Sequence, residues 1–108
     1  MSGLRRTGLE SEVADLTVKH ALDDYGVESI KFNPLGETGI PDRWFLIPGG
    51  RPFIIEFKAP GCKDDPSPKQ DWWIGKMKRL GYDVEVHDNH KTALRAIFRR
   101  VKKAMGVK

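Results

Sequence analysis

An acidic and a basic residue stand near the end of a segment that is otherwise apolar. Residues 53–58 read Phe-Ile-Ile-Glu-Phe-Lys, and this density of β-branched and aromatic residues is typical of a strand. Because side chains alternate across a strand, Glu56 and Lys58 share one face, and Phe53, Ile55 and Phe57 share the other, which we predict to be core. An acid and a base placed together in this way either take part in metal or acid–base chemistry or form a simple ion pair.

A second carboxylate comes from the preceding segment. Residues 42–47 also predict a strand, and Pro48-Gly-Gly-Arg-Pro52 predicts a hairpin turn between the two. A three-residue turn (48–50) places Asp42 opposite Glu56, and a five-residue turn (48–52) places Asp42 opposite Lys58. In both cases the three side chains share one face, whereas a two-residue turn places Asp42 opposite Phe57.

Two neighbouring carboxylates repel each other unless a cation lies between them. Lys58 supplies part of that positive charge, and a divalent ion would supply more. Mg²⁺ prefers hard oxygen ligands such as carboxylates, water and phosphate oxygens, and it activates water for attack on a phosphodiester. The alternative is an ordinary ion pair of Glu56 with Lys58 or Arg43.

These residues resemble a known signature. Pro41-Asp42 followed by Glu56-Phe57-Lys58 resembles the PD-(D/E)xK nuclease signature, and more narrowly the chain resembles a stand-alone, phage-like virus-type replication-repair nuclease (VRR-Nuc) domain. The resemblance covers about residues 9–88. The matching stretches are Gly39-Ile-Pro-Asp-Arg43, the Pro-Gly-Gly turn, Phe53 to Gly61, Ser67-Pro-Lys-Gln70 and Leu80-Gly-Tyr-Asp-Val84.

The resemblance implies a restriction-endonuclease-like core and a set of site residues. Asp42 and Glu56 would bind Mg²⁺ or Mn²⁺ together with the backbone carbonyl of Phe57. Lys58 would be the catalytic lysine, and Gln70 would support the site.

An acid on the first helix usually joins such a site. Glu10 is preferred because it lies nearer the helix face that carries Ala14, and Glu12 is the alternative. Where the family pattern often carries another acid, this chain has Ala14.

The predicted order of elements is α-β-β-β-α-β-α, an α/β fold with a mixed sheet flanked by helices. The expected ranges are 15–25 (beginning between residues 7 and 11), 27–32, 42–47, 53–58, 68–80 (with Gly81 as the stop), 82–86 and about 91–105. Ser67 as N-cap, Pro68 at the first helical position and Gln70 three residues after the cap mark the start of the second helix. The predicted core stripes are Trp73, Met77 and Leu80 on that helix, and Leu94, Ile97, Phe98 and Val101 on the last.

Two further clusters have more than one interpretation. His87-Asp-Asn-His90 suits a metal or HNH-type site, but a cap of the last helix by Asp88 or Asn89 is the preferred interpretation. Trp72 and Trp73 are adjacent, so they cannot both face the core. An exposed Trp72 could stack on a base.

The 108 residues suit one domain (1–108), and the single cysteine, Cys62, excludes an internal disulfide. Apolar runs are too short for a membrane span or a secretory signal, so we expect a cytoplasmic protein. Residues 89–108 carry seven basic and no acidic side chains, whereas residues 1–88 carry twelve basic and fifteen acidic ones. This asymmetry favours a nucleic-acid partner. The candidate phosphate contacts are Lys63, Lys69, Lys76, Arg95 and Arg99.

The leading hypothesis is a divalent-metal-dependent, structure-specific DNA endonuclease. The resemblance suggests a homodimeric Holliday-junction resolvase acting on branched or duplex DNA. The alternatives are a nuclease directed to flaps or nicks, and a non-catalytic nucleic-acid-binding accessory module.

Overall fold

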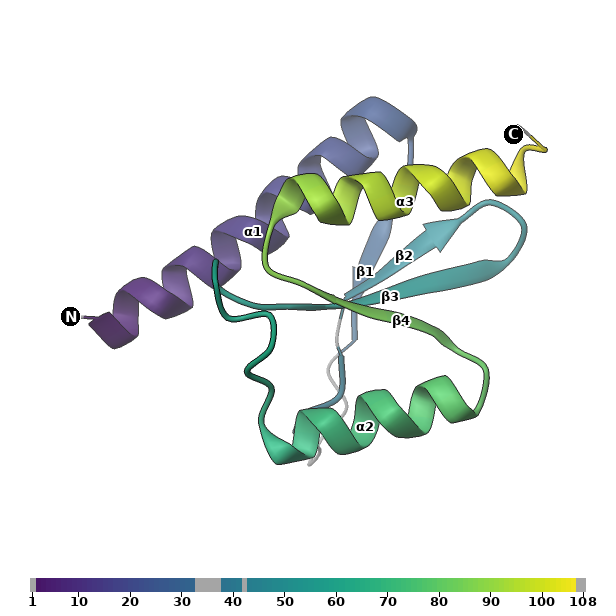
Figure 1. Ribbon diagram of the computed structural model, residues 1–108. Helices are drawn as coiled ribbons and strands as arrows, with labels where there is room; N and C mark the ends of the chain where they lie inside the picture. Colours follow the sequence, from purple (N-terminus) through teal and green to yellow (C-terminus); the bar gives the residue numbers. More distant parts are fainter. Residues whose placement is uncertain (1, 33–37, 42, 107–108) are drawn as a thin grey trace.

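In the part of the chain that the structure describes, three helices and four strands follow one another in the predicted order. The computed structural model describes residues 2–32, 38–41 and 43–106, and within the first helix it describes side chains from Glu10 onward. The elements are α1 (Ser2–Tyr25), β1 (Ser29–Lys31), β2 (Arg43–Ile47), β3 (Arg51–Phe57), α2 (Pro68–Arg79), β4 (Asp83–His87) and α3 (His90–Ala104) (Figure 1). The α/β class and the mixed sheet flanked by helices are therefore confirmed.

The four strands form one sheet in the order β1-β2-β3-β4. The first three strands are antiparallel, and β4 runs parallel to β3. A parallel neighbour needs a crossover connection, which α2 provides. Ile47 lies opposite Arg51, so the hairpin turn is the three-residue alternative of the two odd-length turns considered above.

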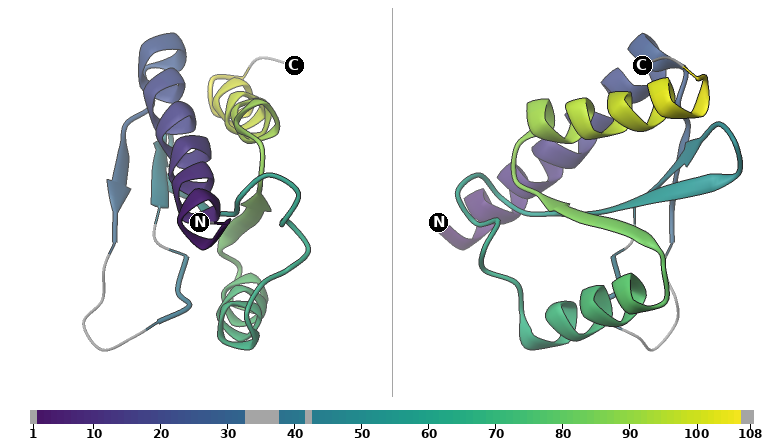
Figure 2. Two further views of the ribbon diagram at one scale, coloured as in Figure 1. Left: turned by 90° about the vertical axis from the view of Figure 1, so that its left-hand side faces the viewer. Right: turned by 45° about the vertical axis from the view of Figure 1, so that its right-hand side comes forward.

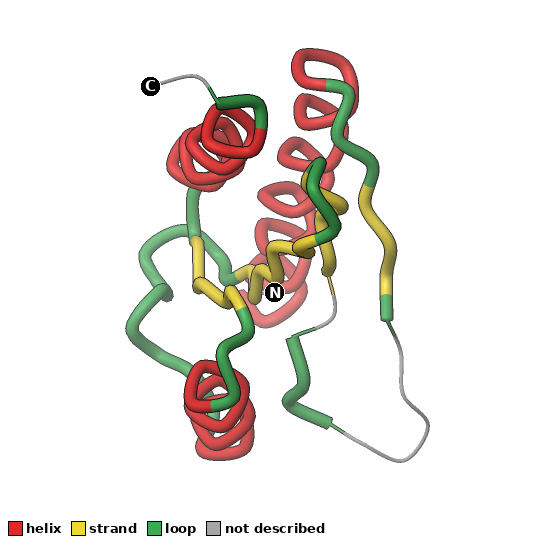
Figure 3. Tube along the Cα trace, turned by 90° about the vertical axis from the view of Figure 1, so that its right-hand side faces the viewer, coloured by secondary structure: helices red, strands yellow, loops and turns green. Residues whose placement is uncertain are grey.

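Helices cover both faces of the sheet. α1 and α3 pack together on one face, and α2 lies on the other (Figures 2 and 3). On the first face, Phe53 and Ile55 of β3 pack with Ile97 of α3. On the second, Ile54 packs with Ile74 and Met77 of α2. β3 is therefore buried on both sides, and the prediction that Phe53, Ile55 and Phe57 form core is confirmed.

Both ends of α2 are capped by residues that the sequence analysis named. The Ser67 side chain accepts from the Gln70 backbone N–H and the Gln70 side chain accepts from the Ser67 backbone N–H, which completes the expected capping box. At the other end, Gly81 N donates to the Lys78 carbonyl and Tyr82 N donates to the Met77 carbonyl. This pair of bonds is a Schellman motif, which Gly81 permits because its φ is +93°.

Some boundaries and core assignments differ from the predictions. α1 begins at Ser2, before the expected start. Leu80 is 66% exposed because the buried side of α2 centres on Ile74 and Met77, about a quarter turn away. Phe98 is also exposed, since the side of α3 that faces the core carries Ala93, Ala96, Ile97 and Val101. Its ring stacks on Tyr25 of α1 at 5.0 Å. No helix in the described ranges is long and apolar enough to cross a membrane.

Candidate active site

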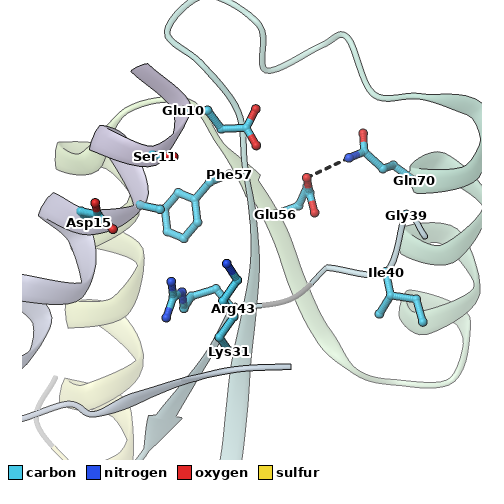
Figure 4. Close-up of a pocket in the computed structure, with 11 residues that line it drawn as sticks. Glu10, Ser11, Asp15, Lys31, Gly39, Ile40, Arg43, Glu56, Phe57 and Gln70 are labelled. Carbon is cyan, nitrogen blue, oxygen red and sulfur yellow. Dashed lines mark hydrogen bonds between the residues drawn. The ribbon is translucent and has the colours of Figure 1, made fainter. Parts of the chain in front are cut away.

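A cavity of about 350 Å³ lies where β3 ends, between α1 and the start of α2 (Figure 4). Side chains from both helices and from three strands line it. The polar ones are Glu10, Ser11, Asp15, Lys31, Arg43, Glu56 and Gln70. Two of the predicted site residues of β3 and α2 therefore face the same cavity as the preferred acid of α1.

Glu56 and Lys58 are a buried acid and base on the same face of β3. Their exposed fractions are 8% and 9%, and Lys58 Nζ lies 3.9 Å from Glu56 Oε2. Beyond the last residue of β3, Lys58 N donates to the His87 carbonyl at 2.9 Å, so the alternation of the strand continues through Lys58. The predicted shared face is thus confirmed, and a buried charged pair of this kind is stable only with further hydrogen bonds.

Gln70 supplies those hydrogen bonds from α2. Its Nε2 donates to Glu56 Oε2 at 3.0 Å, and its Oε1 accepts from Lys58 Nζ. The same Oε1 accepts from Ser67 N at 3.0 Å. Lys58 Nζ and Ser67 N are both donors, so the Gln70 oxygen must face them. The Gln70 NH₂ group therefore faces the Glu56 carboxylate. One side chain therefore caps the helix and orients both members of the acid–base pair.

The segment before β2 is held against the start of α2. A Cβ added to Gly39 would lie 3.0 Å from the Lys69 carbonyl carbon, and Gly39 also has a φ of +85°. This position therefore requires glycine. Pro41 is buried, and its carbonyl accepts from Trp44 Nε1 at 3.4 Å. Asp42, the predicted partner of Glu56, lies outside the described residues.

On α1 the structure separates the two candidate acids, since Glu10 lines the cavity and Glu12 does not. Sequence reasoning missed Asp15, which lies one turn after Ser11. Of the two cations that line the cavity, it missed Lys31 and considered Arg43 only as an ion-pair partner of Glu56. The cations are direct partners in the β1–β2 ladder, a pairing that could have been found only with that register in hand. Among the described residues, which exclude Asp42, no three potential ligands are grouped closely enough to hold a metal ion.

The predicted phosphate contacts come from three parts of the chain. Lys69 and Lys76 belong to α2, whereas Arg95 and Arg99 belong to α3 on the other face of the sheet. Lys63 lies in the loop before α2, where its backbone N–H donates to Asp88 Oδ2.

Trp72 is 54% exposed, as one of the two tryptophans had to be. Lys76 Nζ lies 4.9 Å from the centre of its ring, close enough for a cation–π contact. The indole of Trp72 is therefore accessible, and its face is already polarised by a cation.

The histidine cluster serves structure. Asn89 caps α3 by accepting from Lys91 N at 2.7 Å, which confirms one of the two expected caps. Both ring nitrogens of His87 are engaged, Nδ1 with Thr92 Oγ1 at 3.0 Å and Nε2 with Glu85 Oε1 at 2.8 Å. Burial lowers the pKa of His87, and the hydrogen bond to Glu85 opposes this only in part.

Arg100 links α3 to β4 through its hydrogen bonds to Asp83 and Glu85. It donates to Asp83 through Nε at 2.6 Å and through one Nη at 2.9 Å, and it donates to Glu85 at 2.8 Å. Its guanidinium carbon lies 3.6 Å from the centre of the Phe53 ring. Partial burial raises the pKa of Glu85, but the hydrogen bonds from His87 and Arg100 outweigh this effect and leave it below its usual range.

No protein-family model matches the chain. The chain is 35% identical over 78 residues to a protein of Acyrthosiphon pisum secondary endosymbiont phage 1 named "Putative nuclease p44". The match covers 69% of this chain and 82% of the phage protein. The chain therefore belongs to the same family as this phage protein, which carries the name of a nuclease.

Proposed function

We propose that this protein is a nuclease that hydrolyses phosphodiester bonds in DNA at the cavity between α1 and α2. The observation that carries the proposal is the buried set of Glu56, Lys58 and Gln70 at the end of β3. A buried acid and base whose orientations are both set by one amide are typical of sites where charge is positioned for chemistry. The name of the phage relative supports the same activity.

The oxygen donors of this site fit a divalent cation of the Mg²⁺ or Mn²⁺ type. Glu56 and Glu10 line the cavity, and Gln70 fixes one oxygen of Glu56. Hard cations prefer such carboxylate oxygens. Asp42 and the Phe57 carbonyl would complete the set, as the resemblance implies. When bound, the ion would lower the pKa of a water molecule and offset charge on the phosphate.

The other residues act through charge and position. We assign Lys58 the role of holding a positive charge beside the attacked phosphate, where it also orients the water nucleophile. Gln70 holds the Lys58 and Glu56 side chains in position, because it is hydrogen-bonded to both, and their nearest charged atoms lie 3.9 Å apart. Lys31 and Arg43 at the cavity wall would attract the DNA backbone.

The finer proposal is a Holliday-junction resolvase that acts as a homodimer. A two-fold symmetric pair would make two symmetric cuts across a four-way junction. The cleavage of flaps or nicked duplex is the competing specificity.

A cleavage panel tests the activity and its specificity together. Four-way junction, flap, nicked and linear duplex DNA are each incubated with Mg²⁺, Mn²⁺ or EDTA. The variants are Asp42→Asn, Glu56→Gln, Lys58→Ala and Lys58→Met, the last of which keeps the volume of the buried side chain. Lys19→Ala, which removes a lysine from the exposed side of α1, is the matched control.

We expect metal-dependent cleavage by the wild type and by Lys19→Ala, and at least about a 100-fold loss in each site variant that retains its circular dichroism. Paired nicks on the junction would support the resolvase. Cleavage confined to flaps or nicks would replace that specificity. If pure wild-type protein binds DNA but cleaves no substrate, the enzyme assignment is wrong and the protein is a binding module.

A further inference from the structure

A second and larger concavity lies at the opposite end of the sheet. It has a volume of about 920 Å³ and is formed by the β2–β3 turn, the start of β4 and the last turns of α2 and α3. Figure 1 shows these four segments together at the right-hand end of the molecule, away from the start of α2. We call it the hairpin groove. None of its residues belongs to the cavity of Glu56.

The hairpin groove is strongly basic. Four of its cations come from three separate elements: Arg51, Lys78, Arg99 and Lys103. Its other arginine, Arg100, and its acid, Asp83, neutralise each other through two hydrogen bonds. Within the described residues, no ion pair engages any of the four cations. Their charge is therefore directed to solvent or to a ligand.

Helix stability explains only part of this charge. Lys78 and Lys103 stand in the last turns of α2 and α3, where cations favour the helix dipole. Arg51 begins β3, and Arg99 precedes the last turn of α3. Neither stabilises a helix end, yet both line the same groove, so their convergence points to an anionic ligand.

An aromatic ring stands at the rim of the hairpin groove. Tyr82 is half-exposed, and the Schellman bonds of the α2 terminus fix its backbone. An exposed ring beside several cations suits a nucleic acid, whose phosphates meet the cations and whose unpaired bases stack on aromatic faces.

We propose that the hairpin groove binds the phosphate backbone of nucleic acid at a distance from the cleavage site. This inference rests on the proposed nuclease function, because that function makes nucleic acid the polyanion the protein meets. Arg51 and Glu56 are five residues apart on β3, which corresponds to about 16 Å. At about 3.4 Å per nucleotide, the groove would hold the backbone some five nucleotides from the cut.

Binding in EDTA tests the groove without cleavage. Fluorescence anisotropy measures the affinity of the wild type and of an Arg51→Gln/Lys103→Gln variant for a labelled 30-base-pair duplex and a 30-nucleotide single strand, over a series of salt concentrations. The control is Lys19→Gln/Lys91→Gln, which removes the same charge from α1 and from the far end of α3.

We expect the groove variant to bind the duplex at least about 10-fold more weakly at low salt, with a log–log salt slope smaller by about two. The control variant should lose much less affinity for the duplex. If the ligand is single-stranded, Tyr82→Ala weakens binding and Tyr82→Phe does not. If it is duplex, neither Tyr82 variant has an effect.

Equal losses of affinity and slope in the groove and control variants would overturn the proposal, as would a wild type that binds neither DNA. The failure of the nuclease proposal has a separate signature. In that case the wild type cleaves nothing with any metal, yet the groove variant still binds more weakly than the control.

Discussion

Gln70 is the residue on which the local geometry of the site depends. Its carbonyl oxygen is shared by the N-cap backbone of α2 and by Lys58, and its NH₂ group meets Glu56. A change of this side chain therefore acts on the helix start and on the acid–base pair together. The conservative variant Gln70→Glu separates the two effects, because glutamate also completes a capping box.

We expect Gln70→Glu to retain the folded structure and lose activity. The new carboxylate still accepts from Ser67 N and Lys58 Nζ, but it replaces a donor to Glu56 with a second negative charge. Under the proposed role of Glu56 as a metal ligand, we expect a loss of about 10–100-fold in activity, the range typical of residues that orient such a ligand. Single-turnover cleavage and thermal melting measure the two effects.

Gln70→Ala is the contrasting variant. It removes the half of the capping box that accepts from Ser67 N, as well as the contact with Glu56, so it should also lower stability by about 1 kcal/mol. Full activity in Gln70→Glu would show that the amide has no part in the chemistry.

The sequence predicted some of these residues and not others. Ser67-Pro-Lys-Gln70 is a local signal, so the capping box was foreseeable, as was the shared face of Glu56 and Lys58. Asp15 could not be found in this way. Helical periodicity tells which side chains share a face of α1, but not which part of the helix passes the end of β3.

Among the elements, the segment before β2 makes a close backbone contact with the start of α2. Gly39 approaches the backbone of Lys69 and Gln70 so closely that no side chain fits. This contact sets the distance between the 38–41 segment and the helix that carries Gln70.

We expect Gly39→Ala to displace α2 and to reduce both stability and cleavage. Its Cβ meets backbone at 3.0 Å, in addition to the strain of a φ of +85°. Gly50→Ala is the matched control, since Gly50 has a φ of +83° with nothing within 4 Å. The control should cost about 1 kcal/mol, and Gly39→Ala roughly 1–3 kcal/mol more, in urea denaturation. Equal losses in the two variants would contradict the close contact.

The β2–β3 hairpin shows which features of an element the sequence pattern can predict. Its strands and the position of its turn follow from composition, but two turn lengths fitted the residues equally well. Only the register Ile47–Arg51 separates them. The core stripes of α2 and α3 were partly wrong for a related reason. Ala93 and Ala96 carry a weak hydrophobic signal, yet their small size lets α3 approach the core closely.

For the molecule as a whole, the half-buried ion cluster of Asp83, Glu85 and Arg100 links the last helix to the edge strand β4. Because the pKa of Glu85 is lower in the folded protein than its usual 4.5, folding favours the ionised form. The resulting stability is fully present above about pH 4.5 and is lost as the pH falls through the folded value.

Glu85→Gln should reduce the dependence of folding stability on pH. We expect the free energy of unfolding of the wild type to fall more steeply between about pH 5 and pH 3 than that of the variant. Urea denaturation across this range measures both slopes, and Glu12→Gln, on α1 away from the cluster, is the control. Parallel slopes for the wild type and Glu85→Gln would show that the cluster does not contribute to acid sensitivity.

The acid, the lysine and the amide of the site lie close together in the gene as well as in space. Glu56 and Gln70 are 14 positions apart, with Lys58 between them. Recombination between related genes with a breakpoint in the exposed 48–50 turn would exchange α1 and the first two strands, and with them Glu10 and Asp42. The set of Glu56, Lys58 and Gln70 would be inherited whole, because all three residues follow that breakpoint in the sequence.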